Sequence, residues 1–381
     1  MHETHPAYSE AHALYRDTLR RWVADEIAPH VDAWDEAGTF PRELYKRAAE
    51  IGLLGLGFPD AYGGIEADRF FIIIGAQELA RAGAGGLSAS LLSHTIGAPP
   101  IVKGGSNALK QAVLPAILAG EKISALAITE PGGGSDVANL TTTAVRDGDK
   151  YILNGSKTFI TSGMRADYVT VAVRTGGPGR AGVSLLLVPT DAPGFSRTSL
   201  DRKMGWWCSD TATLYFDDCR VPAANLLGVE NEGFRLIMDN FNSERLWLAA
   251  GCNGFAQVCL DEATAYARER HTFGTPLIGH QAIRHKLADM AQRIRATQAY
   301  LEQVAWQIDN GDNPIADVCL LKNQATQTME FCAREGVQIF GGAGYLRGAK
   351  VERIYREVRV NAIGGGAEEI MRDLAVRQMG L

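Results

Sequence analysis

The 381-residue chain lacks the features that mark a membrane-spanning or nucleic-acid-binding protein. No apolar run approaches the roughly 20 residues that cross a bilayer, so no membrane span is expected. Lys and Arg number 38 against 44 Asp and Glu, and the resulting net charge of −6 disfavours a nucleic-acid partner. The first ten residues show neither the basic nor the apolar segment of a signal peptide, so none is predicted.

Cysteine is also scarce, with six residues that show no C-x-x-C spacing. We therefore expect no metal site. Six cysteines in a chain of this length are interpreted as reduced, mostly buried thiols, which favours a cytoplasmic location.

What is present predicts three zones of an α+β protein. Length alone favours two or three domains. Apolar residues recur at helical spacing before about residue 120, as at Tyr15, Leu19 and Trp22, and alternate as in a strand over Thr211–Phe216. The zones give domains at 1–120, 121–230 and 231–381. The last zone is expected to hold helices at 232–270, 279–310, 313–340 and 367–379.

Two Gly-containing segments in the central zone are interpreted as turns. Asn154-Gly155, between Tyr151–Leu153 and Lys157–Ile160, predicts a β-hairpin, because Asn-Gly supplies the two positive φ angles of a type I′ turn. Gly177–Gly182 matches G-x-G-x-x-G, but a strand follows it instead of a helix. We therefore interpret it as a hairpin loop and not as a dinucleotide site.

The most informative segment is Thr129–Asp136, which reads TEPGGGSD after the apolar run Ile123–Ile128. Three glycines after a buried strand expose backbone that can approach a ligand closely. Backbone N–H groups and the hydroxyls of Thr129 and Ser135 would suit a planar or anionic cofactor.

This segment and several others, in one order along the chain, resemble the acyl-CoA dehydrogenase flavoprotein family. The matching segments are Gly52–Gly64, Ala127–Asp136, Lys157–Gly163, Phe216–Pro222, Arg268–Gly274, Gln338–Tyr345 and Ile363–Met371. The resemblance covers nearly the whole chain. It implies an N-terminal helical domain, a central β-barrel and a C-terminal four-helix bundle, with FAD bound between them.

The resemblance also implies the residues that hold FAD. One group lines the flavin, with Phe159 stacked on the isoalloxazine and the Thr161 hydroxyl near N5: Leu126, Ile128, Thr129, Gly134, Ser135, Phe159, Ile160, Thr161, Ala367 and Glu369. A second group contacts the cofactor of a neighbouring subunit, with Arg270 on its pyrophosphate: Arg270, Thr272, Phe273, Gln281, Gln338 and Gly342. The family more often has Trp at position 159 and Thr at position 367. A site completed across an interface implies at least a dimer, and by family habit a homotetramer.

The catalytic base follows from a departure from one family pattern. Many members carry the base at the position of Gly365, where this chain has no carboxylate. Isovaleryl- and long-chain-type members place it in a Glu-Arg pair on a bundle helix, which matches Glu244-Arg245. Glu244 is therefore the predicted base, and Arg245 resembles a residue that steadies the CoA moiety or the local structure. Substrate-binding residues implied in the same way are Ser135, Asn242, Arg245, Gly364 and Gly365.

The predicted reaction is the α,β-dehydrogenation of an acyl-CoA to the trans-2-enoyl-CoA in fatty-acid or branched-chain β-oxidation. Glu244 removes the α-proton, flavin N5 accepts the β-hydride, and electrons pass to an electron-transfer flavoprotein. The alternative is an acyl-CoA oxidase or a flavin monooxygenase on the same fold. The acyl chain is left open, because Trp206-Trp207 suits either a pocket wall or a packing cluster.

Overall fold

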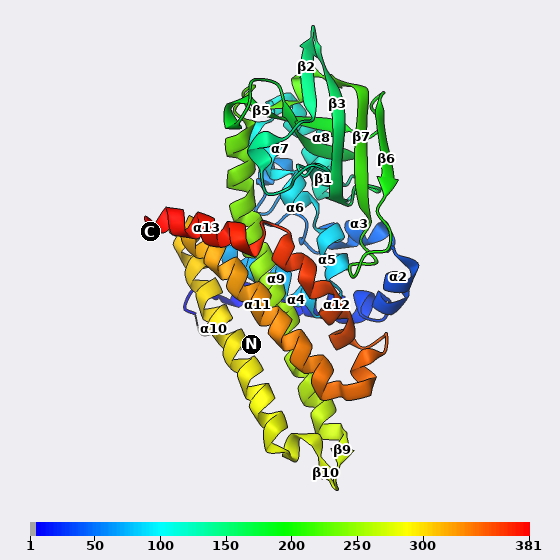
Figure 1. The fold of residues 1–381 in the computed structure, drawn as a ribbon, viewed down its shortest axis with the longest axis vertical. Helices are drawn as coiled ribbons and strands as arrows, with labels where there is room; N and C mark the ends of the chain where they lie inside the picture. The colour runs from blue at the N-terminus through cyan, green and yellow to red at the C-terminus, as the bar shows by residue number, and fades with distance from the viewer. Residues whose placement is uncertain (1–4) are drawn as a thin grey trace.

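The computed structural model describes residues 5–381. The N-terminal segment, in which the sequence predicts no signal peptide, therefore lies partly outside the described residues. Helices form the N-terminal part, a β-sheet the middle and helices the C-terminal part (Figure 1). The predicted α+β order of elements is therefore confirmed.

The N-terminal part consists of short helices around an apolar interior. They are α1 (Glu10–Trp22), α2 (Val31–Ala37), α3 (Glu43–Glu50), α4 (Arg69–Ala80), α5 (Gly85–Leu91), α6 (His94–Gly97), α7 (Pro99–Gly104) and α8 (Asn107–Leu118). Asp68 begins α4 by accepting the N–H groups of Phe70 and Phe71, and Ser106 begins α8 by accepting that of Leu109. Such caps satisfy N–H groups that the first turn of a helix leaves free.

The middle part is an eight-stranded sheet with the order β6-β7-β3-β2-β4-β5-β8, and β1 pairs with β4. The strands are β1 (Ser124–Ala127), β2 (Thr143–Asp147), β3 (Lys150–Thr161), β4 (Tyr168–Arg174), β5 (Val183–Pro189), β6 (Phe195–Ser199), β7 (Thr211–Pro222) and β8 (Leu226–Leu227). Gly177–Gly182 joins the antiparallel strands β4 and β5, so its interpretation as a hairpin loop is confirmed.

The predicted hairpin at Asn154-Gly155 is wrong, because β3 runs unbroken through both residues. Gly155 has a φ of 139° and marks a shift in the pairing of β3 with β7, which is a β-bulge. Asn154 is held by Asp218 of β7, since its side chain exchanges hydrogen bonds of 3.0 and 2.9 Å with that residue. The actual hairpin turn lies at Gly148, between β2 and β3.

The C-terminal part contains α9 (Gly233–Glu269), α10 (Gln281–Asp309), α11 (Ile315–Phe340), α12 (Lys350–Ile363) and α13 (Glu368–Met379). Between α9 and α10 lies a small hairpin of β9 (His271–Thr272) and β10 (Thr275–Pro276). Four of these helices match the predicted ranges, whereas α12 was missed. Its apolar residues Val351, Ile354 and Val358 do recur at helical spacing and are buried.

The helix α9 connects the sheet to the helical half of the molecule (Figure 1). Its first residue, Gly233, lies against β5, where a Cβ atom would come within 2.7 Å of the Ser184 backbone. Farther along, α9 packs on α4, α10, α11 and α12. One helix therefore carries side chains from the sheet into the bundle.

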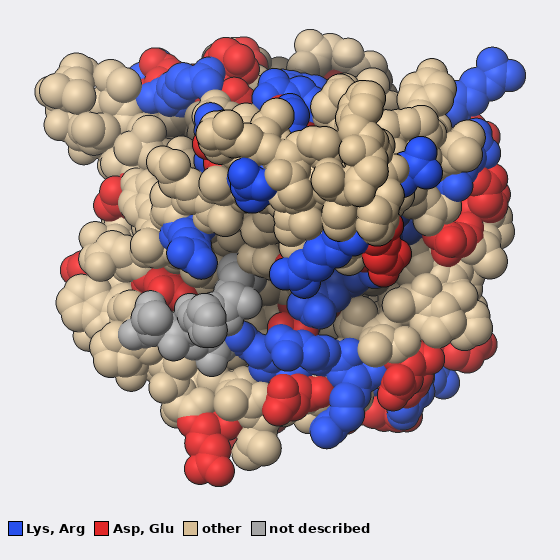
Figure 2. All heavy atoms as spheres, turned by 90° about the horizontal axis from the view of Figure 1, so that it is seen from below, with Lys and Arg blue, Asp and Glu red and all other residues tan. Residues whose placement is uncertain are grey.

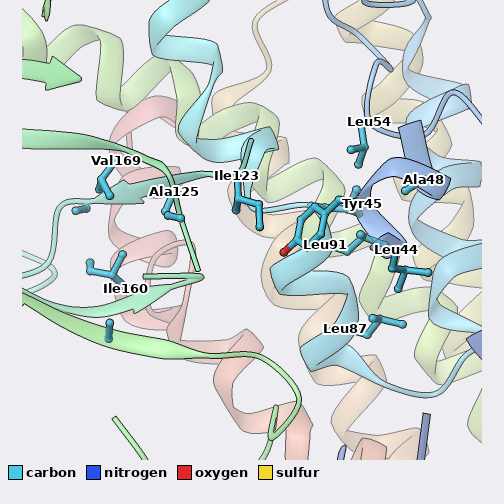
Figure 3. Packing of buried hydrophobic residues seen from close by; sticks show 14 of the residues in the cluster. Leu44, Tyr45, Ala48, Leu54, Leu87, Leu91, Ile123, Ala125, Ile160 and Val169 are labelled. Atoms are coloured by element: carbon cyan, nitrogen blue, oxygen red, sulfur yellow. The ribbon is translucent and has the colours of Figure 1, made fainter. Parts of the chain in front are cut away.

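A continuous apolar core joins the N-terminal helices to the sheet (Figure 3). Leu44, Leu87 and Leu91 approach it from the helices, and Ala125 and Val169 from the strands. Within residues 5–381, no helix is long and apolar enough to cross a membrane. The same residues contain no cluster of three His, Cys, Asp or Glu side chains that could hold a metal, and all six cysteines are buried free thiols.

Candidate active site

The Gly-rich segment after β1 forms an open loop, and the side chain of Glu130 anchors it to the sheet. The carboxylate accepts the Lys157 Nζ at 2.8 Å and also the N–H groups of Thr141 and Thr142. Glu130 is therefore a buried anchor of the loop. From Pro131 to Asp136 the loop is exposed. A Cβ atom at Gly132 or Gly133 would meet nothing within 4 Å, which leaves the backbone open to a ligand.

The end of β3 presents an aromatic ring beside this loop. The N–H of Thr158 donates to the Thr129 carbonyl at 2.9 Å, which places the next residue, Phe159, next to the loop. Phe159 has a φ of 59° and is 69% exposed. A left-handed conformation is costly for a residue with a side chain, and such strain concentrates at functional sites. An exposed, strained ring beside an open Gly-rich loop fits a planar cofactor.

The other predicted residues of this group follow the same two strands. Ile128 and Ile160 are buried, whereas Leu126, Thr129 and Thr161 are half-buried. Gly134 and Ser135 are exposed on the loop. The structure therefore brings this group together at the carboxyl ends of β1 and β3, except for Ala367 and Glu369 at the start of α13.

Glu244 lies on α9 and is half-buried, with the cations Arg245 and Lys322 nearby. Its Oε2 atom is sealed from solvent and has no hydrogen-bond partner. Burial raises the pKa of Glu244 to about 7, although the nearby charges of Arg245 and Lys322 oppose this shift. Such a carboxylate accepts a proton readily near neutral pH, as a general base must.

The loop that follows α12 lies against Glu244. A Cβ atom at Gly365 would be 3.8 Å from Glu244 Oε1, so the two family positions for the base converge on one place. Gly365 and Gly366 have φ angles of 65° and 106°. A glycine at 365 therefore leaves the space in front of Glu244 open.

Arg245 and Asn242 support this arrangement from α9. Arg245 is buried, and its guanidinium donates to the Gly365 carbonyl at 3.0 Å and to Asn242 Oδ1 at 3.1 Å. These contacts support the second of the two roles expected for Arg245, which is to steady the local structure. Asn242 also borders a surface hollow lined by residues of α4, α7, α9, α10 and α11 and of the loop at 312–314.

The second group of predicted cofactor residues lies far from the first along the chain's long axis. Arg270, Thr272, Phe273 and Gln281 belong to the β9–β10 hairpin and the start of α10, at the end of the molecule opposite the sheet (Figure 1). Gln338 and Gly342 lie at the end of α11. Within a single chain, the flavin-lining group and the second group of predicted cofactor residues therefore stay apart.

The second group is exposed and lies in a basic part of the chain. Phe273 is 98% exposed, and Arg270, Gln281, Gln338 and Gly342 are exposed as well. Residues 268–295 carry six cations and two acids: Arg268, Arg270, Arg284, Lys286, Arg293 and Arg295 against Glu269 and Asp289. Figure 2 shows the molecule from below, with Lys and Arg side chains lying among Asp and Glu on this face. The arginines and the lysine within residues 268–295 suit an anionic group such as a pyrophosphate.

Sequence reasoning missed Lys322, which lies on α11 beside Glu244. Its Nζ atom donates to the Ala362 and Gly366 carbonyls at 3.1 and 2.8 Å. The side chain is completely buried. The available signal was a lysine next to Leu321, on a helix whose apolar positions Val318, Leu321 and Ala325 face the core.

Comparison with known proteins identifies the same family in all three parts of the chain. Models of the acyl-CoA dehydrogenase N-terminal, middle and C-terminal domains match residues 9–121, 125–219 and 231–380. The chain is 37% identical to an acyl-CoA dehydrogenase of Bacillus subtilis (strain 168), over 96% of each protein.

Solved structures agree with this similarity. A probable acyl-CoA dehydrogenase from Mycobacterium abscessus superposes with a TM-score of 0.95 at 47% identity, over 98% of this chain and 99% of that one. A glutaryl-CoA dehydrogenase from Mycobacterium smegmatis in complex with FADH2 superposes with a TM-score of 0.92 at 28% identity, over 100% and 97% of the two chains.

Proposed function

Because the chain belongs to the acyl-CoA dehydrogenase family, we propose that it oxidises an acyl-CoA thioester to the trans-2-enoyl-CoA with Glu244 as the base. The observation that carries this proposal is the Glu244 carboxylate, whose pKa is raised by burial to about 7 and whose Oε1 atom lies beside Gly365, the other family position for the base. Family membership makes the protein an oxidoreductase. The identity of the base and the fate of the electrons are the proposal.

Glu244 supplies the proton-transfer half of the reaction. In its ionised form it takes the proton from Cα of the thioester, and its environment favours the neutral acid that results. The backbone N–H of Gly365 is proposed to donate to the thioester carbonyl, where negative charge develops as the proton leaves. Asn242, Gly364 and Ser135 are proposed to hold the rest of the substrate, and Arg245 to support it through the Gly365 carbonyl and Asn242.

The residues of the two cofactor groups would hold FAD. Phe159 and the Thr129–Ser135 loop would bind the flavin, and Arg270 with its neighbours would bind the pyrophosphate of the FAD in an adjacent subunit. The chemistry that FAD supplies when bound is acceptance of the hydride from Cβ. The separation of the two groups within one chain supports a site completed between subunits, so we propose a homotetramer. We further propose that electrons pass to an electron-transfer flavoprotein and that the enzyme acts in the cytoplasm.

Replacement of the base tests this function directly. Glu244→Gln should keep the yellow FAD-bound protein, since Gln preserves the shape of the side chain. The loss of the base is expected to lower acyl-CoA-dependent flavin bleaching by at least about 100-fold. Stopped-flow absorbance of the holoenzyme measures this rate. Asp261→Asn, an exposed change on the same helix, is the matched control. Bleaching by Glu244→Gln at the wild-type rate would remove Glu244 from this role.

Two further measurements separate the alternatives. Rapid peroxide formation with acyl-CoA and oxygen would indicate an oxidase, whereas slow peroxide formation with fast reduction of an electron-transfer flavoprotein supports the dehydrogenase. A flavin monooxygenase does not need a carboxylate base, so Glu244→Gln would leave its substrate oxidation intact. Rates over a series of straight and branched acyl-CoAs would define the acyl chain.

A further inference from the structure

The turn between α12 and α13 is held by two buried cations that come from other helices. Lys322 of α11 donates to the Ala362 and Gly366 carbonyls, and Arg245 of α9 donates to the Gly365 carbonyl. We call these three carbonyls and two cations the carbonyl clamp. Lys322 is 0% exposed and Arg245 is 5% exposed, so these contacts are shielded from solvent.

The clamp sets the direction of peptide groups near Glu244. In a trans peptide the N–H points opposite to the C=O of the same unit. Fixing the Gly365 carbonyl on Arg245 therefore turns the N–H of Gly366 away from Arg245. Fixing the Gly366 carbonyl on Lys322 likewise turns the N–H of Ala367 away from Lys322. Glycines with φ angles of 65° and 106° would otherwise sample many orientations.

The clamp also places positive charge near the base. Both cations favour the ionised form of Glu244 and so oppose the effect of burial on its pKa. The groups that face Lys322 are Glu244, Arg245 and Cys252 of α9 and Glu368 of α13. Burial lowers the pKa of Lys322 to about 8, which leaves it mainly charged at neutral pH. Cys252 is a neutral thiol, because burial raises its pKa to about 12.

We propose that Lys322 is a positioning residue of the dehydrogenation site, which fixes the peptide groups from Gly365 to Ala367 beside Glu244 and holds the Glu244 carboxylate ready for proton removal. This inference rests on the proposed function, since it assumes that Glu244 is the base. The hydrogen bonds of Lys322 go to the backbone carbonyls of Ala362 and Gly366. Lys322 acts through the carbonyl clamp and through its charge.

The test compares Lys322→Met with Lys322→Gln in the FAD-bound enzyme. Both variants remove the charge, whereas Gln keeps an N–H donor for one carbonyl. The rate of flavin bleaching is expected to fall about 10- to 100-fold in Lys322→Met and less in Lys322→Gln. The wild-type rate should fall as pH drops through about 7, because protonated Glu244 cannot act as a base. Both variants should shift this midpoint to higher pH, because Glu244 loses a neighbouring cation.

A purely structural role for Lys322 would lower the yield or the flavin content without moving the pH midpoint, so an unshifted midpoint in both folded variants overturns the inference. Lys46→Met, which removes an exposed lysine of α3, is the charge control and should leave the profile unchanged.

If Lys322→Met and Lys322→Gln do not fold, Lys322→Arg retains the charge with altered reach. It should keep the wild-type midpoint with a lower rate, and a wild-type rate would overturn the positioning role. Activity of Glu244→Gln would instead refute the proposed function itself, which keeps the two failures distinct.

Discussion

Glu130 and Glu244 show how two carboxylates of one chain take different roles. Burial would raise the pKa of Glu130, but the Lys157 ammonium and the hydrogen bonds from Thr141 and Thr142 outweigh it and hold the pKa well below its usual range. Glu244 has nearby cations but no hydrogen-bond partner on Oε2, so burial prevails and its pKa rises. Glu130 is therefore a fixed charge that shapes the loop, and Glu244 is a group that can exchange a proton.

The Glu130–Lys157 pair should be costly to break from one side. Lys157→Met leaves a buried carboxylate without its counter-charge, which is expected to destabilise the fold by about 3–5 kcal/mol. Chemical denaturation of the purified enzyme measures this loss. Glu130→Gln combined with Lys157→Met removes both charges and should recover part of the stability. Equal losses in the single and double variants would show that the unpaired Glu130 carboxylate does not cause the destabilisation.

At the scale of elements, the β3 strand shows the limit of a short turn motif. Asn-Gly is a strong hairpin signal when nothing else holds the residues. Here the pairing of β3 with β7 on both sides of Gly155 and the contacts of Asn154 with Asp218 stabilise a bulge instead. Gly155 is required because a Cβ atom would lie 2.8 Å from the Thr142 Cα atom.

Gly155→Ala should therefore destabilise the sheet more than Gly148→Ala does. Both glycines have positive φ angles, but a Cβ atom at Gly148 would meet nothing within 4 Å. The Gly155 variant must also relieve a backbone clash, and overpacking of this kind costs about 1–3 kcal/mol. Denaturation midpoints of the two variants, compared with the wild type, measure the difference. The same loss in both would show that the contact with Thr142 relaxes freely.

At the scale of the whole molecule, a buried carboxylate joins parts from all three zones of the chain. Glu357 of α12 accepts the N–H of Gly85 on α5 at 2.6 Å and that of Trp206 after β6 at 3.1 Å. Beside it, Trp207 lies against the Arg356 guanidinium, 3.7 Å from the ring centre. Trp207 therefore belongs to a packing cluster, one of the two roles that the sequence left open.

Glu357 should make stability depend on pH. Burial raises its pKa to about 7, although the Gly85 N–H opposes the shift. Between about pH 4.5 and 7 the folded protein holds this proton and the unfolded chain does not, so the contribution falls as pH rises through 7. Relative to Glu357→Gln, the wild type should lose about 2–3 kcal/mol of stability between pH 5 and 8. Glu244 is present in both the wild type and Glu357→Gln, so its effect on the free energy of unfolding cancels when the two are compared. A difference that is constant with pH would contradict the raised pKa.

Most of the fold could be predicted from sequence because helical spacing, strand alternation and glycine placement are local properties. They correctly indicated the helix–sheet–helix order and the β4–β5 loop at Gly177–Gly182. Helix α12 was missed although Val351, Ile354 and Val358 recur at helical spacing, because charged residues such as Arg353 and Glu357 stand between them and are typical of an exposed segment. Its burial depends on Asp35 of α2, which pairs with Arg353 and Arg356 of α12 from more than 300 residues away.

The sequence by itself determined the family, the class of reaction and the residue types that the reaction requires, since these are written in motifs of adjacent residues. Only the tertiary structure decided which carboxylate is paired and which is left with a raised pKa. It also decided that Lys322 reaches the backbone near Gly365 and that one chain separates its two groups of cofactor residues. The physical reason is that a pKa depends on burial and on nearby charges, and residues 244, 322 and 365 become neighbours only when α9, α11 and the turn after α12 pack together.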